Sequence, residues 1–149
     1  MFAHGDSAAS LSNQVLLYAG RGPWNDEGMK EGAQIISRQT AHFAPGQHWA
    51  QLSCLYGECI MPPSTFQQFS DYFAERQDKG LRHLAIVILQ SEVEHTIRQQ
   101  FSAVYCNSGL NFQFFNDIDA ACQWLALCGF PLEQRQLATF LASCSFVDP

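Results

Sequence analysis

Residues 81–89 read "LRHLAIVIL", and this stretch decides the fold class. Its apolar residues from Leu84 to Leu89 follow one another without the polar alternation of a strand that has one face in water. A continuous apolar run of this length is typical of a strand that is covered on both faces, as in the centre of an α/β sheet. The stretch therefore predicts a central strand with helices packed above and below it.

Outward from this strand, apolar runs and helical periodicity alternate along the chain. Further strands are predicted at 13–20 ("NQVLLYAG"), 48–56 ("HWAQLSCLY") and 111–115 ("NFQFF"). Helices are predicted at 25–42, 64–80, 91–105, 116–129 and 131–146, from apolar residues at helical spacing and from capping residues at the ends. In the strand at 48–56, Trp49, Gln51, Ser53 and Leu55 alternate with Ala50, Leu52, Cys54 and Tyr56.

This order predicts an α/β fold with a four- or five-stranded, mostly parallel (mixed) sheet that is flanked by helices. Strands that alternate with helices imply right-handed crossover connections between parallel neighbours. The amphipathic segment 131–146 adds a C-terminal helix to this pattern. We expect residues 13–149 to form one domain and residues 1–12 to be a flexible N-terminal arm, with weak strand pairing of the arm as the alternative.

Composition excludes some classes of function. The chain of 149 residues has a formal net charge of −6, which argues against nucleic-acid binding because phosphate recognition needs a cationic surface. Its N-terminal residues lack the basic and apolar regions of a secretory signal, so we expect a cytoplasmic protein. The six cysteines are accordingly expected to be reduced thiols, most of them packed as small apolar residues.

The segment 54–65, "CLYGECIMPPST", is the most unusual connection in the chain. Cys54 and Cys59 form a single C-x4-C pair, whereas a structural zinc site needs two such pairs, so we expect no metal. Cys59 precedes the helix predicted at 64–80, whose positive end lowers the pKa of a nearby thiol. Ser64 or Thr65 is predicted to cap that helix.

The stretch from about residue 13 to 128 resembles the SpoIIAA-like proteins, which have the STAS-type fold. The matching segments are "GPWNDE" before the first helix, "HWAQLSCLY", "LRHLAIVIL" and "FQFFNDIDAACQWL". The last of these carries the pattern in Phe115, Asp117, Ala120, Ala121, Trp124 and Leu125. STAS-type antagonists have a phosphoacceptor loop with an Asp-Ser pattern, and the corresponding loop here, "YGECIMPPST", lacks it.

The resemblance implies a non-enzymatic regulatory or ligand-binding module with no cofactor and no catalytic residue. Its expected ligand is a protein partner or a small apolar or anionic molecule, bound where the loops 21–25 and 57–65 meet at two helix N-termini. The candidate rim residues are Trp24, Asn25, Tyr56, Cys59, Ile60, Met61, Ser64 and Thr65. The alternative is a protein-interaction domain that forms a homodimer or contacts a membrane surface through 131–146, and a third hypothesis is a thiol-dependent enzyme that uses Cys59.

Overall fold

The computed structural model of the chain describes residues 6–147. Their strands are β1 (Asp6–Ser12), β2 (Val15–Arg21), β3 (Trp49–Tyr56), β4 (Leu81–Leu89) and β5 (Asn111–Phe115). Their helices are α1 (Asp26–Thr40), α2 (Pro63–Asp78), α3 (Glu94–Tyr105), α4 (Ile118–Leu127) and α5 (Gln134–Ser143). The β4 and β5 bounds agree with the prediction, whereas α3 begins three residues later than predicted because Val93 is its N-cap.

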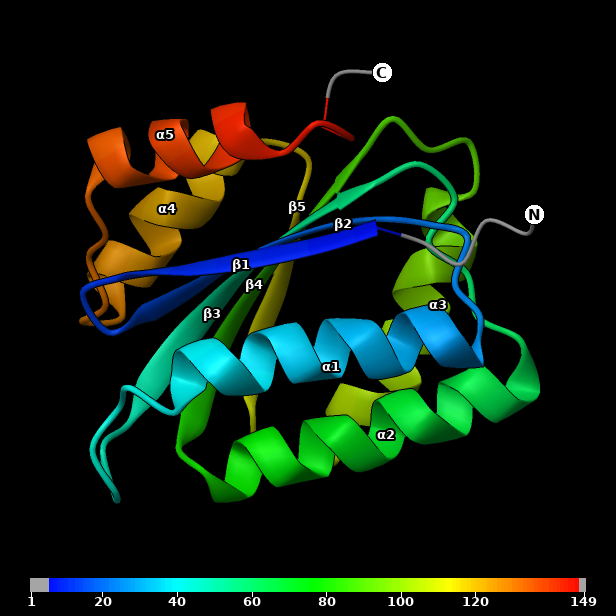
Figure 1. Cartoon of the computed structure of the whole chain (residues 1–149), viewed down its shortest axis with the longest axis horizontal. Coiled ribbons are helices and arrows are strands. Elements are labelled where there is room, and N and C mark those ends of the chain that lie inside the picture. The colour runs from blue at the N-terminus through cyan, green and yellow to red at the C-terminus, as the bar shows by residue number, and fades with distance from the viewer. Residues whose placement is uncertain (1–5, 148–149) are drawn as a thin grey trace.

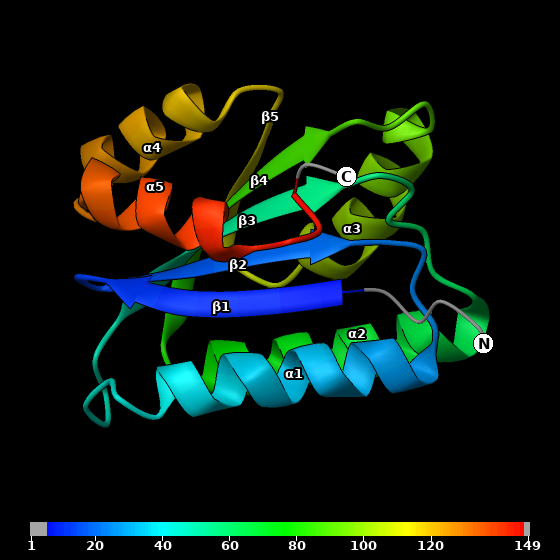
Figure 2. The same cartoon turned by 45° about the horizontal axis from the view of Figure 1, so that its top comes forward.

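The strands form one sheet in the order β1-β2-β3-β4-β5, in which β1 is antiparallel to β2 and the other neighbours are parallel. The predicted α/β class and mixed, mostly parallel sheet are therefore confirmed. Because consecutive parallel strands are neighbours, right-handed crossovers place all three connecting helices on the same face. Figures 1 and 2 show α1, α2 and α3 on that face, with α4 and α5 on the other.

The two faces of the sheet belong to two separate apolar clusters, and β3 contributes to both. Trp49 and Leu55 pack under α1, α2 and α3, whereas Leu52 and Cys54 pack under α4 and α5. The alternation predicted for 48–56 is confirmed. All eight residues of β3 are buried, so every side chain of this strand faces a packed layer.

The predicted flexible arm is wrong for residues 6–12, which form the edge strand β1, and its remainder lies outside the described residues. The sequence "DSAASLS" has small and polar side chains with little strand propensity of their own. The strand exists because it pairs along its whole length with β2, from Asp6 opposite Arg21 to Ser12 opposite Val15. Such pairing depends on tertiary context rather than on local propensity.

The C-terminal helix is shorter than the predicted 131–146, since α5 begins only at Gln134. The preceding residues are held extended by the β1–β2 turn: Ser12 Oγ accepts from the Glu133 amide at 2.8 Å, and Asn13 Nδ2 donates to the Pro131 carbonyl at 3.1 Å. Leu137 and Phe140 are buried in the cluster under α4 and α5. The apolar face of α5 is thus used within the chain's own core.

Within residues 6–147, no helix has both the length and the apolar character that crossing a bilayer requires.

Candidate functional site

The loops 21–25 and 57–65 meet as predicted, but the chain's own Asp26 occupies the place expected for an anion. Asn25 caps α1, because its Oδ1 accepts from the Gly28 amide at 2.9 Å. The Asp26 carboxylate accepts from Thr65 Oγ1 at 2.6 Å and from Ser64 Oγ at 2.8 Å. These bonds hold the N-terminal turns of α1 and α2 together and lower the pKa of Asp26.

The predicted capping role of Ser64 or Thr65 is wrong. Pro62 is the N-cap of α2 and makes no side-chain cap bond, and Pro63 is the first helical residue. Proline is favoured there because its missing N–H would have no partner within the helix and its φ is already helical. The hydroxyls of Ser64 and Thr65 are consequently free to bind Asp26 of the neighbouring helix.

The apolar rim residues do not form one surface. Trp24 and Met61 are buried and line a cavity under α1 and α2, whereas Tyr56 packs on the opposite face of the sheet. Ile60 is exposed. Of the eight candidates, Trp24 and Met61 are thus the two that the structure brings to a common hollow.

Cys59 is fully buried, and its surroundings favour the neutral thiol over the reactive thiolate. Its Sγ donates to the Tyr56 carbonyl at 3.2 Å. Burial raises its pKa to about 11, and this outweighs the lowering by contacts with Trp24 and with the Gly22 backbone. At neutral pH the side chain is a thiol packed in the core, as was expected for most of the cysteines.

A cavity of about 60 Å³ lies between the sheet and helices α1, α2 and α3. Its apolar lining includes Trp24, Ile36, Leu55, Phe69, Ile86 and Phe101. Its polar lining comes from Tyr18, Gln51, Ser53, Tyr72, Arg76 and Tyr105. An apolar lining with a few convergent polar groups is typical of ligand sites, whose volume is usually about 300–1,000 Å³.

Gln51 is a polar residue of the cavity that has a buried atom without a hydrogen-bond partner in the protein. It lies in the middle of β3 with 4% of its surface exposed, on the face that carries the apolar cluster under α1, α2 and α3. Its Nε2 donates to Ser53 Oγ at 2.8 Å, while its Oε1 is enclosed and has no hydrogen-bond partner. Exchanging the two amide atoms still leaves one polar atom of Gln51 without a partner. Such an atom costs about 1–3 kcal/mol of folding free energy.

Arg76 of α2 contributes the second unpaired group. Its side chain is half-buried, its Nε is enclosed, and neither a hydrogen bond nor an ion pair reaches the guanidinium from residues 6–147. Burial lowers its pKa, and the nearby Tyr105, Tyr18 and Glu75 act in the opposite direction. The guanidinium offers donors to the cavity that the protein itself does not use.

The tyrosines of the cavity are neutral hydrogen-bonding groups. Burial raises the pKa of both Tyr18 and Tyr105 well above the ordinary value for a phenol. The Tyr18 hydroxyl lies 2.7 Å from Ser7 Oγ of β1. Gly32 of α1 permits this packing, because a Cβ at that position would lie 3.0 Å from Ser7 Oγ.

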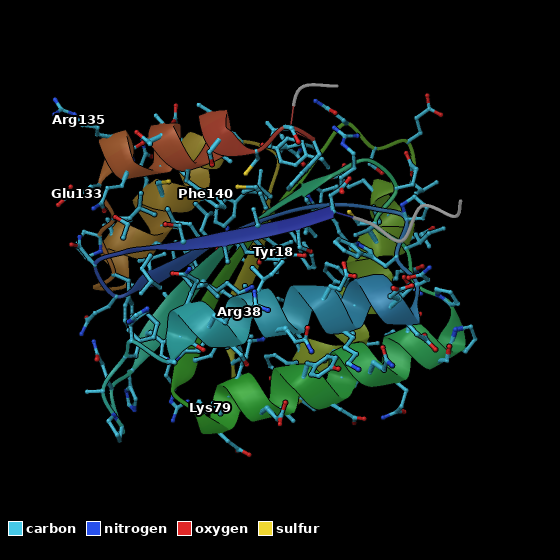
Figure 3. The ribbon with its side chains drawn as sticks, viewed as in Figure 1. Tyr18, Arg38, Lys79, Glu133, Arg135 and Phe140 are labelled. Carbon is cyan, nitrogen blue, oxygen red and sulfur yellow. The ribbon has the colours of Figure 1, made fainter. Side chains whose placement is uncertain are left out.

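A surface groove of about 370 Å³ between α1 and α2 adjoins the cavity. Both hollows are lined by Ala33, Ile36, Tyr72 and Arg76. The groove also carries Arg38, Glu75 and Lys79. Figure 3 shows Arg38 on α1 and Lys79 beyond the end of α2, with Arg135 of α5 on the far side of the sheet.

Sequence reasoning missed Gln51, Ser53 and Arg76, although a signal for each was present. The alternation at 48–56 places Gln51 and Ser53 on the same face as Trp49 and Leu55. Arg76 follows Phe73 by three residues, so it extends the apolar stripe of α2. A polar residue on a face that the pattern predicts to be buried breaks the local rule, and such breaks are expected at functional or strained sites.

Neither a candidate metal site nor a match to a known protein was found for the described residues. Among the residues that the structure describes, no group of three or more His, Cys, Asp or Glu side chains is placed to hold a metal ion. Comparison with protein-family models, curated proteins and solved structures finds no match, so the resemblance to the SpoIIAA-like proteins stays a prediction.

Proposed function

We propose that this chain is a non-enzymatic ligand-binding module, SpoIIAA-like in its STAS-type fold, that holds a small molecule in the cavity under α1, α2 and α3. The observation that carries the proposal is the enclosed Oε1 of Gln51, which has no hydrogen-bond partner in a side chain that is 4% exposed. A ligand with an N–H or O–H group at this position satisfies that oxygen. Its binding then gives a regulatory signal through the helices that cover the cavity.

The cavity lining favours a bound molecule over an empty packing defect. Cavities that stay empty in proteins are apolar, whereas a polar cavity holds water or a ligand that completes its hydrogen bonds. Here Gln51 lacks a donor and Arg76 lacks an acceptor, although both side chains line the same cavity. A sequence selected for stability alone would place apolar residues at both positions.

The same groups support binding rather than catalysis. The phenols of Tyr18 and Tyr105 stay protonated, because burial raises the pKa of each. Cys59 is not among the residues that line the cavity, and its pKa of about 11 disfavours the thiolate. The lining thus offers hydrogen bonds and an arginine charge but no group that is poised to transfer a proton near neutral pH.

The test is a ligand screen that compares the wild-type chain with Gln51→Leu. Small molecules are screened by thermal shift, and those that stabilise the protein are located by amide chemical-shift changes. A specific ligand at 100 times its Kd stabilises the native state by about 2.7 kcal/mol. We expect the stabilisation to disappear in Gln51→Leu and to persist in Gln113→Leu, the same substitution at an exposed position of β5. Ligands that stabilise Gln51→Leu as much as the wild type contradict the proposal.

A further inference from the structure

The surface groove between α1 and α2 and the interior cavity meet at Arg76, and this junction narrows the class of ligand. Arg76 lines both hollows, with its Nε enclosed and unpaired. We propose that the ligand is a short branched carboxylic acid that enters between α1 and α2, places its carboxylate on Arg76 and inserts its aliphatic end into the cavity. This inference rests on the binding function proposed above and assigns the chemistry of its ligand.

Charge favours an anion at this junction. The chain has eight Lys and Arg residues against 14 Asp and Glu, yet Arg38, Arg76 and Lys79 line the groove with Glu75 as its one acidic residue. The groove therefore carries a net positive charge, whereas the chain as a whole carries a net negative charge. A cationic hollow attracts anions and raises their rate of association.

The guanidinium of Arg76 suits a carboxylate in particular. Its planar fork donates two parallel hydrogen bonds to the two oxygens of a carboxylate, and Nε belongs to that fork. No carboxylate within residues 6–147 forms an ion pair with Arg76, because the ion pair among these residues joins Arg98 to Glu94 on α3. A bound carboxylate would pair the guanidinium and neutralise a half-buried charge.

The volume of the cavity limits the apolar part of the ligand. A protein cavity of about 150 Å³ accommodates benzene, which has six carbons. By proportion, 60 Å³ accommodates roughly two or three carbons. A branched end such as an isopropyl group fits this space, whereas the long chain of a fatty acid does not.

Gln51 adds a requirement for a hydrogen-bond donor. Its Oε1 accepts from an O–H or N–H group of the ligand. With Gln51 Nε2 donating to Ser53 Oγ, Oε1 is the amide atom that remains for the ligand. A 2-hydroxy acid with an isopropyl group combines the anion, the donor and the branched end.

The experiment measures three related probes by isothermal titration of the full chain. The probes are 2-hydroxyisovalerate, isovalerate and 2-hydroxyisovaleramide, which differ by the hydroxyl and by the charge. We expect 2-hydroxyisovalerate to bind most tightly, and the other two to bind about tenfold more weakly because each loses one recognised group. Equal binding of the acid and its amide overturns the assignment of a carboxylate.

Variants of Arg76 locate the charge. Arg76→Gln should weaken the binding of 2-hydroxyisovalerate by about tenfold or more. Arg76→Lys should weaken it by a smaller factor, because lysine keeps the charge but not the planar fork. Arg135→Gln removes the same charge from an exposed position across the sheet and should leave binding unchanged. If Arg76→Gln does not fold, Arg76→Lys still decides the question, and unchanged binding in a folded Arg76 variant overturns the inference.

The outcomes separate the two proposals. If the amide binds as tightly as the acid and Gln51→Leu abolishes both, the cavity is a binding site but its ligand is not selected by charge. If none of the three probes binds while the broader screen finds a ligand that depends on Gln51, the acid class is wrong and the binding function stands. If no ligand in the screen depends on Gln51, both proposals fail.

Discussion

Gln51 and Ser53, two residues apart on β3, hydrogen-bond to each other at 2.8 Å in the middle of an apolar core. The bond satisfies Gln51 Nε2 and leaves Oε1 unpaired. Their positions on the same face follow from the two-residue repeat of a strand, and the central place of β3 in the sheet buries both. Within the protein, the pair therefore leaves one buried polar atom without a protein partner.

The double substitution Gln51→Leu with Ser53→Ala should raise the free energy of unfolding by about 1 kcal/mol. Replacing both partners of a buried polar pair by apolar groups removes the penalty of the unpaired atom. Urea unfolding of the unliganded chain measures the change. Leu52→Ala, on the opposite face of the same strand, is the contrasting control and should cost about 2–5 kcal/mol. A loss of stability in the double variant would mean that the pair is needed for folding.

Asp26 should make stability depend on pH in the acid range. Hydrogen bonds from Thr65 and Ser64 lower its pKa below the ordinary value of 3.8, so the unfolded chain binds the proton more readily than the folded chain does. The contribution is present above the unfolded pKa and is lost as pH falls through the folded pKa. Thermal unfolding between about pH 5 and pH 2 should show a flatter pH profile for Asp26→Asn than for wild type. Asp71→Asn, on an exposed part of α2, is the matched control.

Cys59 should react with alkylating reagents far more slowly than Cys106. Cys59 is fully buried with a pKa of about 11, whereas Cys106 is exposed. Because the thiolate is the reactive form and must meet the reagent, burial and a raised pKa both slow the reaction. Iodoacetamide labelling near neutral pH, followed by peptide mass mapping, measures both rates, and labelling in urea confirms that each site can react. Faster labelling of Cys59 would revive the thiol-enzyme hypothesis.

Gly80→Ala should destabilise the protein more than Gly46→Ala does. Both glycines have positive φ, +117° at Gly80 and +79° at Gly46, so alanine is disfavoured by the backbone at either position. At Gly80 a Cβ would also collide with the Gln47 carbonyl oxygen, whereas Gly46 has open space. We expect a cost of about 1 kcal/mol at Gly46 and at least about 2 kcal/mol at Gly80. Equal midpoints in urea unfolding would show that the loop before β3 yields to the added methyl group.

The central strand and the start of the first helix, which depend on local pattern, were confirmed, whereas the edge strand and the start of the last helix depend on distant partners. The continuous apolar run predicted β4, and the capping pattern at the start of 25–42 predicted the start of α1, which Asn25 caps, because both signals act within a few residues. β1 was predicted only as the alternative to a flexible arm, because its small polar residues form a strand through pairing with β2. The start of α5 was misplaced because Ser12 and Asn13 hold the segment before it extended.

The residues of the candidate site likewise divide into features that follow from local periodicity and features that follow from distant contacts. The predicted alternation of β3 placed Gln51 and Ser53 on one face of the strand, since strand periodicity is a local property. Arg76 was not singled out from the sequence, although it follows Phe73 by three residues on α2. The sequence did not show that these residues line one cavity, because the sheet order and the packing of α1 and α2 decide which faces meet. The sequence by itself determined the α/β class, the central strand and the order of the elements. Three features were decided only by the tertiary structure: the hydrogen bond from Thr65 to Asp26, the burial of Cys59, and the shared cavity in which Gln51 and Arg76 lack protein partners. Each depends on contacts between residues that are far apart in the chain.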